Sequence, residues 1–365
     1  MKRFHAANFR QLAYSHKQTG CVLRTSFLFV ICFFLFGCGQ PPEVLSLSGQ
    51  TMGTRYHITL VNHDNEKTLA SNRAVLQQKI DAKLVEINQL MSTYISDSEI
   101  SRFNASPHNT WFSLSPEMVT VVGYSLYLSE ITNGKFDISV SPLIDLWGFG
   151  AAGEMAFPSD DAITLAKSQV GWQSLILDKD NLRIKKTKPL SIDLSSIAKG
   201  YGVDEIAQLL EEADVQNYLV EIGGEIRVKG KNSEGIYWRV GVETPSFFQT
   251  SAKKVIQLSD QSVATSGDYR NFFEKDGVRY SHTIDPSTGK PVIHNIASLT
   301  VVENSEEYSA MKSDGLATAF MALGERQALQ LANELGIAIY ILSYNKDVFS
   351  ESFSSAFTPY LTKTQ

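Results

Sequence analysis

The sequence predicts an α+β fold, organised as one large unit of mixed strands and helices. Residues 54–61 alternate apolar and polar side chains as a half-buried strand does, whereas residues 72–91 space their apolar side chains as a helix does. Patterns of both kinds recur as far as residue 342, with no tandem repeat and no low-complexity tract. About 325 residues follow the apolar stretch near the N-terminus, enough for one large domain or two interlocked ones.

Two helices are predicted in the first half of the chain. The helix over residues 72–91 presents Ile80, Leu84, Ile87 and Leu90 on one face. A second helix, residues 116–131, begins after Ser115, a good N-cap, with proline at its first position. Short strands are expected at residues 175–177 and 182–184.

The second half continues the mixture of strands and helices, although the pattern does not give the order of strands in a sheet. Its predicted helices are residues 203–212, 310–323 and 328–335. Its predicted strands are residues 218–222, 238–242, 296–302 and 338–342.

The N-terminus has the pattern of a lipoprotein signal. Five basic residues and no acidic one precede Cys38, and the apolar stretch from Ser26 to Phe36 is too short to span a bilayer as a helix. We expect residues 1–37 to be a signal peptide and Cys38 to carry the lipid, the alternative being an uncleaved signal anchor. Residues 38–47 would form a tether, 48–345 the main domain and 346–365 a C-terminal extension.

Processing at Cys38 would change the cysteine content and the charge of the working domain. The only other cysteines are Cys21 and Cys32, so the mature chain would have no disulfide, no cysteine metal site and no cysteine nucleophile. The net charge of −6 would become −11, from 28 basic and 39 acidic residues, which argues against nucleic acid as a partner. The lipid would therefore do the anchoring at a membrane.

Residues 193–202 are candidates for an anion site. Ser195, Ser196, Lys199 and Gly200 lie at an expected loop-to-helix junction, where free backbone N–H groups and a lysine attract negative charge. The alternative is a capped helix with a solvated lysine.

Asp314 and Thr318 are candidates for a metal site. They lie four residues apart in a predicted helix and so share a face. A carboxylate and a hydroxyl suit Mg²⁺, which prefers oxygen ligands and leaves positions open for phosphates. The alternative is that Asp314 caps the helix and Thr318 only fills space.

Aromatic residues and one histidine complete the candidates. Tyr94, Trp147, Phe149 and Tyr201 lie beside or close to glycine or serine, which suits stacking on a flat ring, although core packing is the alternative. His282 is a candidate general base or a structural histidine.

Short motifs occur along most of the chain in a fixed order, and together they resemble the ApbE family of FAD:protein FMN transferases. The likeness runs from about Gly49 to Leu342. The motifs are Thr-Met-Gly-Thr (51–54), Phe-Asp-Ile-Ser-Val-Ser-Pro-Leu (136–143), Leu-Trp-Gly-Phe-Gly (146–150), Asp-Leu-Ser-Ser-Ile-Ala-Lys-Gly-Tyr (193–201), Glu-Ile-Gly-Gly-Glu (221–225), Thr-Ser-Gly-Asp-Tyr-Arg-Asn (265–271), Tyr-Ser-His-Thr-Ile-Asp-Pro (280–286) and Asp-Gly-Leu-Ala-Thr (314–318).

The resemblance implies a T-fold-like α+β catalytic domain and a Mg²⁺-dependent reaction. FMN from FAD would be transferred to a threonine hydroxyl of an acceptor protein as a phosphodiester, and AMP would leave. The expected acceptors are subunits of the Na⁺-translocating NADH:quinone reductase or of the Rnf complex. The enzyme would be lipid-anchored through Cys38 at the periplasmic face of the inner membrane. The alternatives are an FAD-binding lipoprotein without transfer activity and a Mg²⁺-dependent FAD pyrophosphatase.

The resemblance also implies roles for particular residues. His282 would deprotonate the acceptor threonine, and the metal ligands would be Asp314, Thr318 and the backbone carbonyl of Ser196. The flavin contacts would be Met52, Tyr94, Trp147, Gly148, Phe149, Asp193, Lys199 and Ile284.

Overall fold

The structure, a computed structural model, describes residues 41–63, 73–149, 157–242, 254–267, 272–275, 278–345 and 348–361. Residues from Pro42 onward form one compact unit. The predicted signal peptide and Cys38 lie outside the described residues, as does Gly150 of the third motif segment.

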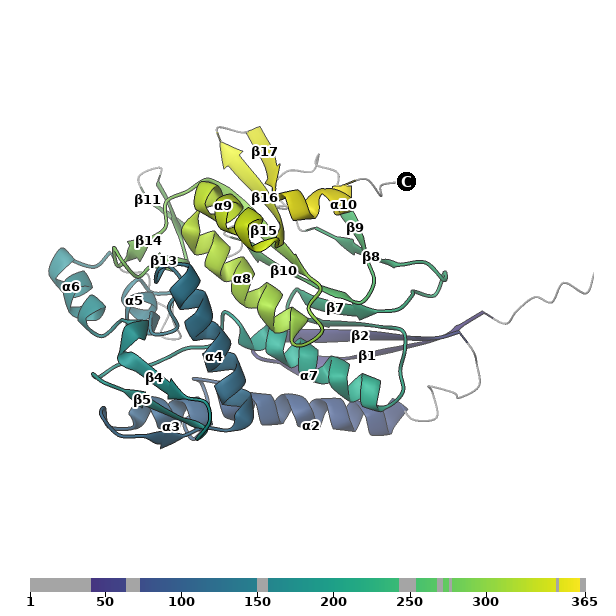
Figure 1. The fold of residues 1–365 in the computed structure, drawn as a ribbon, viewed down its shortest axis with the longest axis horizontal. Helices are drawn as coiled ribbons and strands as arrows, with labels where there is room; N and C mark the ends of the chain where they lie inside the picture. Colours follow the sequence, from purple (N-terminus) through teal and green to yellow (C-terminus); the bar gives the residue numbers. More distant parts are fainter. Residues whose placement is uncertain are drawn as a thin grey trace, which may run out of the picture. The chain divides into compact units, whose positions relative to one another are not determined.

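An eight-stranded antiparallel sheet runs through the centre of this unit (Figure 1). Every neighbouring pair is antiparallel. In spatial order the strands are β1 (Glu43–Thr51), β2 (Thr54–Asn62), β6 (Tyr218–Ile222), β7 (Glu225–Lys229), β10 (Gln261–Gly267), β15 (Ile296–Glu303), β16 (Ala338–Asn345) and β17 (Val348–Phe353). The strands nearest the two chain ends therefore form the two edges of the sheet.

Helices cover one face of the sheet (Figure 1). They are α2 (Arg73–Met91), α7 (Ala198–Glu212), α8 (Ser309–Leu323) and α9 (Glu325–Leu335), with α4 (Pro116–Ile131) packed on α8. Leu84, Ile206 and Ile222 belong to one buried cluster, which joins α2 and α7 to β6. Burial of such apolar area is the main favourable term in folding, so this helix layer fixes α7 and α8 against the sheet.

The opposite face of the sheet is also covered. The strands β8 (Trp238–Gly241) and β9 (Val255–Leu258), together with η3 (Ser355–Phe357) and α10 (Thr358–Leu361), pack there. Val302, Tyr340 and Phe357 share this second cluster. Residues 296–302 of β15 are consequently all buried, because both faces of that strand are covered.

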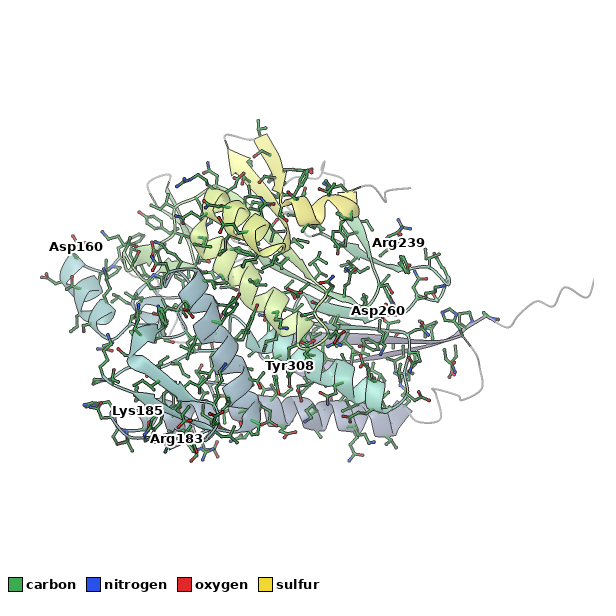
Figure 2. All side chains as sticks on the ribbon, in the orientation of Figure 1. Asp160, Arg183, Lys185, Arg239, Asp260 and Tyr308 are labelled. Carbon is green, nitrogen blue, oxygen red and sulfur yellow. The ribbon has the colours of Figure 1, made fainter. Side chains whose placement is uncertain are left out.

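A smaller lobe surrounds α4. It contains α3 (Glu99–Ala105), α5 (Ser141–Leu146), α6 (Asp160–Ser168), η2 (Trp172–Ser174), and a three-stranded sheet of β3 (Phe112–Ser113), β5 (Arg183–Lys186) and β4 (Leu175–Asp178). Figure 2 shows Arg183 and Lys185 on this lobe, and both lie over the ring of Trp111, at 4.4 and 4.7 Å from its centroid. Two further pairs are β11 (Phe272–Lys275) with β12 (Val278–Ser281) and β13 (Ile284–Asp285) with β14 (Lys290–Pro291).

The predicted α+β class is confirmed, although several boundaries differ from expectation, three of them with consequences for the fold. The helix predicted at residue 203 begins at Ala198, so Lys199 and Gly200 lie in its first turn. Residues 43–47, assigned to the tether, lie in β1, because this segment pairs with β2 along its length and buries Leu45 and Leu47. The fold also continues past residue 345, since β17 completes the sheet.

Within the described part of the chain, no helix combines the length and the apolar character needed to cross a bilayer.

Candidate active site

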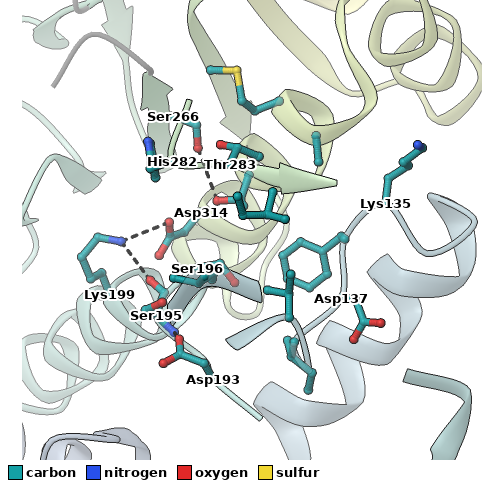
Figure 3. A pocket seen from close by; sticks show the side chains of 18 of the residues that line it. Lys135, Asp137, Asp193, Ser195, Ser196, Lys199, Ser266, His282, Thr283 and Asp314 are labelled. Atoms are coloured by element: carbon teal, nitrogen blue, oxygen red, sulfur yellow. Dashed lines mark hydrogen bonds and ion pairs between the residues drawn. The ribbon is translucent and has the colours of Figure 1, made fainter. Parts of the chain in front are cut away.

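A cavity of about 300 Å³ opens where α7 and α8 meet the ends of central strands (Figure 3). Segments far apart in the sequence form its wall: residues 135–144, 193–199, 223–225, 265–267, 282–286 and the face of α8 that carries Asp314, Thr318 and Met321. Six of the motif segments found in the sequence therefore meet at this one place, including the one on α8.

The start of α7 lies at this cavity, but most of its backbone N–H groups are already bonded: those of Ile197 and Ala198 donate to the Leu194 carbonyl, and that of Gly200 donates to Asp314. Its N-cap residue, Ile197, makes no side-chain capping hydrogen bond. Just before it, Asp193 accepts a 2.7 Å hydrogen bond from the Ser195 amide, and Ser195 and Ser196 both line the cavity. The positive end of the helix and the Lys199 side chain nevertheless favour a negatively charged group, such as a phosphate, at this place.

The close crossing of α7 and α8 depends on Gly200. A Cβ added there would come within 2.2 Å of the Ala310 carbonyl oxygen, so only glycine allows this approach. The Gly200 amide donates a 2.9 Å hydrogen bond to Asp314 Oδ2. The contact leaves Asp314 Oδ1 facing the side of the cavity where Lys199 lies.

Lys199, Glu225 and Asp314 form a charged cluster in the cavity wall. Lys199 Nζ lies 3.5 Å from Glu225 Oε1 and 3.5 Å from Asp314 Oδ1, and Figure 3 shows the latter pair. The carboxylates are buried, at 5% and 3% exposure. Burial disfavours the charged form of Lys199, but the two carboxylates outweigh this and raise its pKa.

Burial has the larger effect on the two carboxyl groups of the cluster. It raises the pKa of Glu225 to about 8, against the opposing influence of Lys199 and with the Asp314 carboxylate adding to the rise. It also raises the pKa of Asp314, although Lys199 and the Gly200 amide act in the other direction. Such perturbed groups in a cavity are typical of functional sites.

Asp204 fixes the start of α8, and it thereby fixes the position of Asp314 on the same helix. It accepts hydrogen bonds from the amides of Ala310 and Met311, at 3.2 and 2.8 Å, and pairs with Arg227 at 2.7 Å. The N-cap residue of α8, Tyr308 (labelled in Figure 2), offers no side-chain cap. Asp204 on α7 therefore does the capping from a neighbouring helix.

The predicted metal ligands come together and suit a hard cation. Asp314, Thr318 and Ser196 all line the cavity, and the Thr318 hydroxyl lies 3.3 Å from that of Ser266. Among the described residues no group of three His, Cys, Asp or Glu could hold a metal. One carboxylate, a hydroxyl and a carbonyl are nevertheless oxygen donors of the kind that suits Mg²⁺ shared with substrate phosphates.

His282 lies in the cavity wall beside Thr283 and Ile284 (Figure 3). Its ring meets that of Phe149 edge to face, with centroids 6.4 Å apart. The segment that follows His282 is anchored by Lys135, whose Nζ lies 2.5 Å from Asp285 Oδ2 and 3.0 Å from Ser287 Oγ. His282 is thus placed where it can reach a group in the cavity.

Residues 52–341 match the ApbE family. The chain belongs to the ApbE family. It is 42% identical over 330 residues to FAD:protein FMN transferase of Vibrio cholerae, covering 90% of this chain and 96% of that protein. The corresponding protein of Haemophilus influenzae is 40% identical over 337 residues, covering 91% and 95%.

Solved structures of ApbE proteins have the same fold. The flavin transferase ApbE from Vibrio cholerae superposes with a TM-score of 0.80 at 40% identity, covering 88% of this chain and all of that one. Apo flavinyl transferase ApbE from Pseudomonas stutzeri gives 0.80 at 36% identity, covering 89% and 98%. The predicted ApbE resemblance and the predicted enzyme class, a flavin transferase, are confirmed.

Some of the flavin contacts expected for an ApbE protein line the cavity. These are Asp193, Lys199 and Ile284. Met52, Tyr94, Trp147, Gly148 and Phe149 are not among the lining residues of the described structure. Tyr94 is 80% exposed, on a loop that reaches the cavity wall through a 3.3 Å hydrogen bond from Thr93 to Asp193.

Other surroundings are found for two of these expected contacts, Trp147 and Met52, and for Tyr201, which was expected only as a stacking candidate. Trp147 is buried, stacks on Tyr280 and donates its indole N–H to the Gly289 carbonyl at 2.8 Å. Met52 has φ = 49° and packs against Gly202 of α7. Tyr201 is a core residue that stacks on Tyr308. Flavin contacts by Met52, Tyr94 and residues 147–149 stay predictions.

Sequence reasoning missed several cavity residues of this ApbE protein. Glu225, Lys135 and Asp137 line the cavity but were assigned no role. The sequence did contain one indication of Glu225, because this charged residue directly follows the Gly223-Gly224 turn. Asp137 is buried and accepts hydrogen bonds from the Ser139 and Trp172 amides, which shapes the 135–144 wall.

Proposed function

We propose that this protein transfers FMN from FAD to a threonine hydroxyl of an acceptor protein, in a Mg²⁺-dependent reaction that releases AMP. The observation that carries the proposal is the meeting of Ser196, Lys199, Asp314 and Thr318 in one cavity. Phosphoryl transfer depends mainly on positioning and on neutralising the phosphate charge. The cavity wall offers a cation, a helix start and oxygen ligands for both tasks.

The chain's own residues would carry most of the chemistry. The positive end of α7 would attract phosphate oxygens, and the Lys199 ammonium would neutralise part of their charge. Asp314, Thr318 and the Ser196 carbonyl would hold Mg²⁺, which when bound neutralises the pyrophosphate further. The buried position of Asp314 and the Gly200 amide fix the orientation of this carboxylate.

His282 would take the proton of the acceptor hydroxyl. The threonine oxygen then forms a bond to the phosphorus of the FMN part, and the bond from that phosphorus to the AMP oxygen breaks. AMP leaves as a phosphate monoester anion, and the proton on His282 passes to solvent. The acceptor supplies the nucleophile, in keeping with a mature chain that would have no free thiol, because the Cys38 sulfur would carry the lipid.

The acceptors would be membrane electron-transfer subunits, such as those of the Na⁺-translocating NADH:quinone reductase or the Rnf complex. Support comes from the lipoprotein pattern that ends at Cys38. A lipid on Cys38 would hold the enzyme at the periplasmic face of the inner membrane, beside such subunits.

One incubation tests the proposal. The domain without its signal is mixed with FAD, Mg²⁺ and a candidate acceptor subunit, and the intact masses are measured. An acceptor that gains the mass of FMN, and does not gain it with Asp314→Ala, supports transfer. Free FMN with an unchanged acceptor would identify a pyrophosphatase, and intact FAD without products would leave only a binding lipoprotein.

A further inference from the structure

Glu225 is a buried carboxylate in the cavity wall to which the mechanism above assigns no step. It is 5% exposed, and its Oε1 lies 3.5 Å from Lys199 Nζ. Its other oxygen, Oε2, is buried and has no hydrogen-bond partner within the described part of the chain. An incompletely satisfied buried carboxylate costs free energy, so its presence in the cavity calls for a function.

Lys199 and a divalent cation would compete for the same oxygen. Asp314 Oδ2 is engaged by the Gly200 amide, whereas Asp314 Oδ1 lies 3.5 Å from Lys199 Nζ. A cation bound at Asp314 needs that second oxygen, and it also repels the nearby ammonium group. The site can hold both positive charges only if Lys199 has another counter-charge within reach.

Glu225 meets this requirement by position. It is the first residue of β7 and follows a turn in which Gly223 and Gly224 adopt φ = 64° and 109°. The turn is braced, since Glu221 Oε1 accepts a 2.7 Å hydrogen bond from the Gly224 amide. A Cβ at Gly223 would lie 3.3 Å from Lys199 Cδ, so the lysine stem passes directly over this turn.

We propose that Glu225 is a positioning residue that can pair with the Lys199 ammonium in place of Asp314, so that Asp314 is free to bind the divalent cation. The inference rests on the proposed function, because it assumes a cation at Asp314. Glu225 acts through Lys199 and touches neither the flavin nor the reacting phosphorus. When both carboxyl groups are ionised, the three side chains carry one net negative charge, which favours a cation.

A double-mutant cycle on cation affinity tests this without any turnover. Mn²⁺ binding to the flavin-free protein is titrated by EPR, with Mg²⁺ as competitor, for the wild type, Glu225→Gln, Lys199→Met and the double variant. We expect Glu225→Gln to weaken Mn²⁺ binding by about tenfold, because Lys199 then pairs only with Asp314. In the Lys199→Met background, the same change should alter the affinity by less than about threefold.

The outcomes separate this inference from the proposed function. Equal losses in both backgrounds would mean that Glu225 acts on the cation directly, and unchanged affinity in Glu225→Gln would mean that it does not act at all. Either result overturns the inference and leaves the metal assignment intact. A wild-type protein that binds no Mn²⁺ or Mg²⁺ would instead overturn the metal assignment of the proposed function, and this inference with it.

Two further variants serve as a charge control and as a substitute if Glu225→Gln does not fold. Glu234→Gln removes the same charge from an exposed position between β7 and β8 and should bind Mn²⁺ like the wild type. If Glu225→Gln does not fold, Glu225→Asp withdraws the carboxylate from Lys199 by one methylene. It should weaken cation binding in the wild-type background only, and equal effects in both backgrounds would again refute the inference.

Discussion

The Gly200 amide donates a 2.9 Å hydrogen bond to Asp314 Oδ2 across the crossing of α7 and α8. The two residues are 114 positions apart in sequence. The contact orients the carboxylate expected to hold the cation, and it exists only because glycine lets the helices approach. One residue thus serves helix packing and ligand orientation at once.

Gly200→Ala should destabilise the protein by about 1–3 kcal/mol, because the added methyl meets the Ala310 carbonyl oxygen at 2.2 Å. Urea unfolding would measure the loss. The same variant should weaken cation binding, because separating the helices moves Asp314. Gly241→Ala is the matched control, since a Cβ there meets nothing within 4 Å, and its cost should stay within about 0.5 kcal/mol. Equal stability of the two variants would contradict the packing argument.

Asp204→Ala should destabilise the protein by about 3–5 kcal/mol, because it leaves the half-buried Arg227 with only its 3.5 Å contact to Glu211 and uncaps α8. The expected result is a large fall in the urea midpoint with loss of FAD binding. Asp180→Ala, at an exposed turn, is the control and should change little. A mild effect of Asp204→Ala would show that α8 is held mainly by its apolar contacts.

Chelation should abolish FMN transfer, because the pyrophosphate charge would no longer be shielded by a cation at Asp314 and Thr318. Acceptor labelling by intact mass, in EDTA and after Mg²⁺ is added back, measures this. Full labelling in EDTA would contradict the metal assignment.

His282→Ala should slow FMN transfer by about 100-fold while weakening FAD binding much less, since a general base acts in the transition state. Single-turnover labelling measures the transfer rate, and a flavin fluorescence titration measures the affinity for FAD. His57→Ala, an exposed histidine on β2, should leave both unchanged. Equal losses of rate and affinity in His282→Ala would make the residue a flavin contact rather than a base.

The Lys135–Asp285 pair should make stability depend on pH in the acid range. Burial alone would raise the pKa of Asp285, but Lys135 and Ser287 outweigh it and lower the pKa. The unfolded chain therefore binds this proton at higher pH than the folded one, so the stabilisation is present above the unfolded pKa of about 4 and is lost as pH falls through the folded value.

Asp285→Asn should reduce that pH dependence, measured as the change in unfolding free energy between neutral and acid pH. Asp160→Asn is a suitable control, because its pair with Lys290 is exposed and exposed pairs contribute little. An unchanged pH dependence in Asp285→Asn would rule out this pair as its source.

Much of the fold followed from local patterns. The helix α4 matched its predicted ends, because Ser115 and Pro116 define its start in a way that needs no distant contact. The pairing of Asp314 with Thr318 on one helix face was equally local. The start of α7 was placed too late, since the small residues Ala198, Gly200 and Gly202 carry no apolar periodicity and are buried by their contacts with α8 and β6.

The sequence by itself determined the α+β class, the family, and the residue types that carry the chemistry. These follow from periodicity and from ordered motifs, both of which are properties of short segments. Only the tertiary structure decided that Glu225 and Lys199 share an ion pair and that Asp204 caps α8 from α7. Such contacts join segments through helix crossings and strand pairings, and their distances depend on packing that no local pattern encodes.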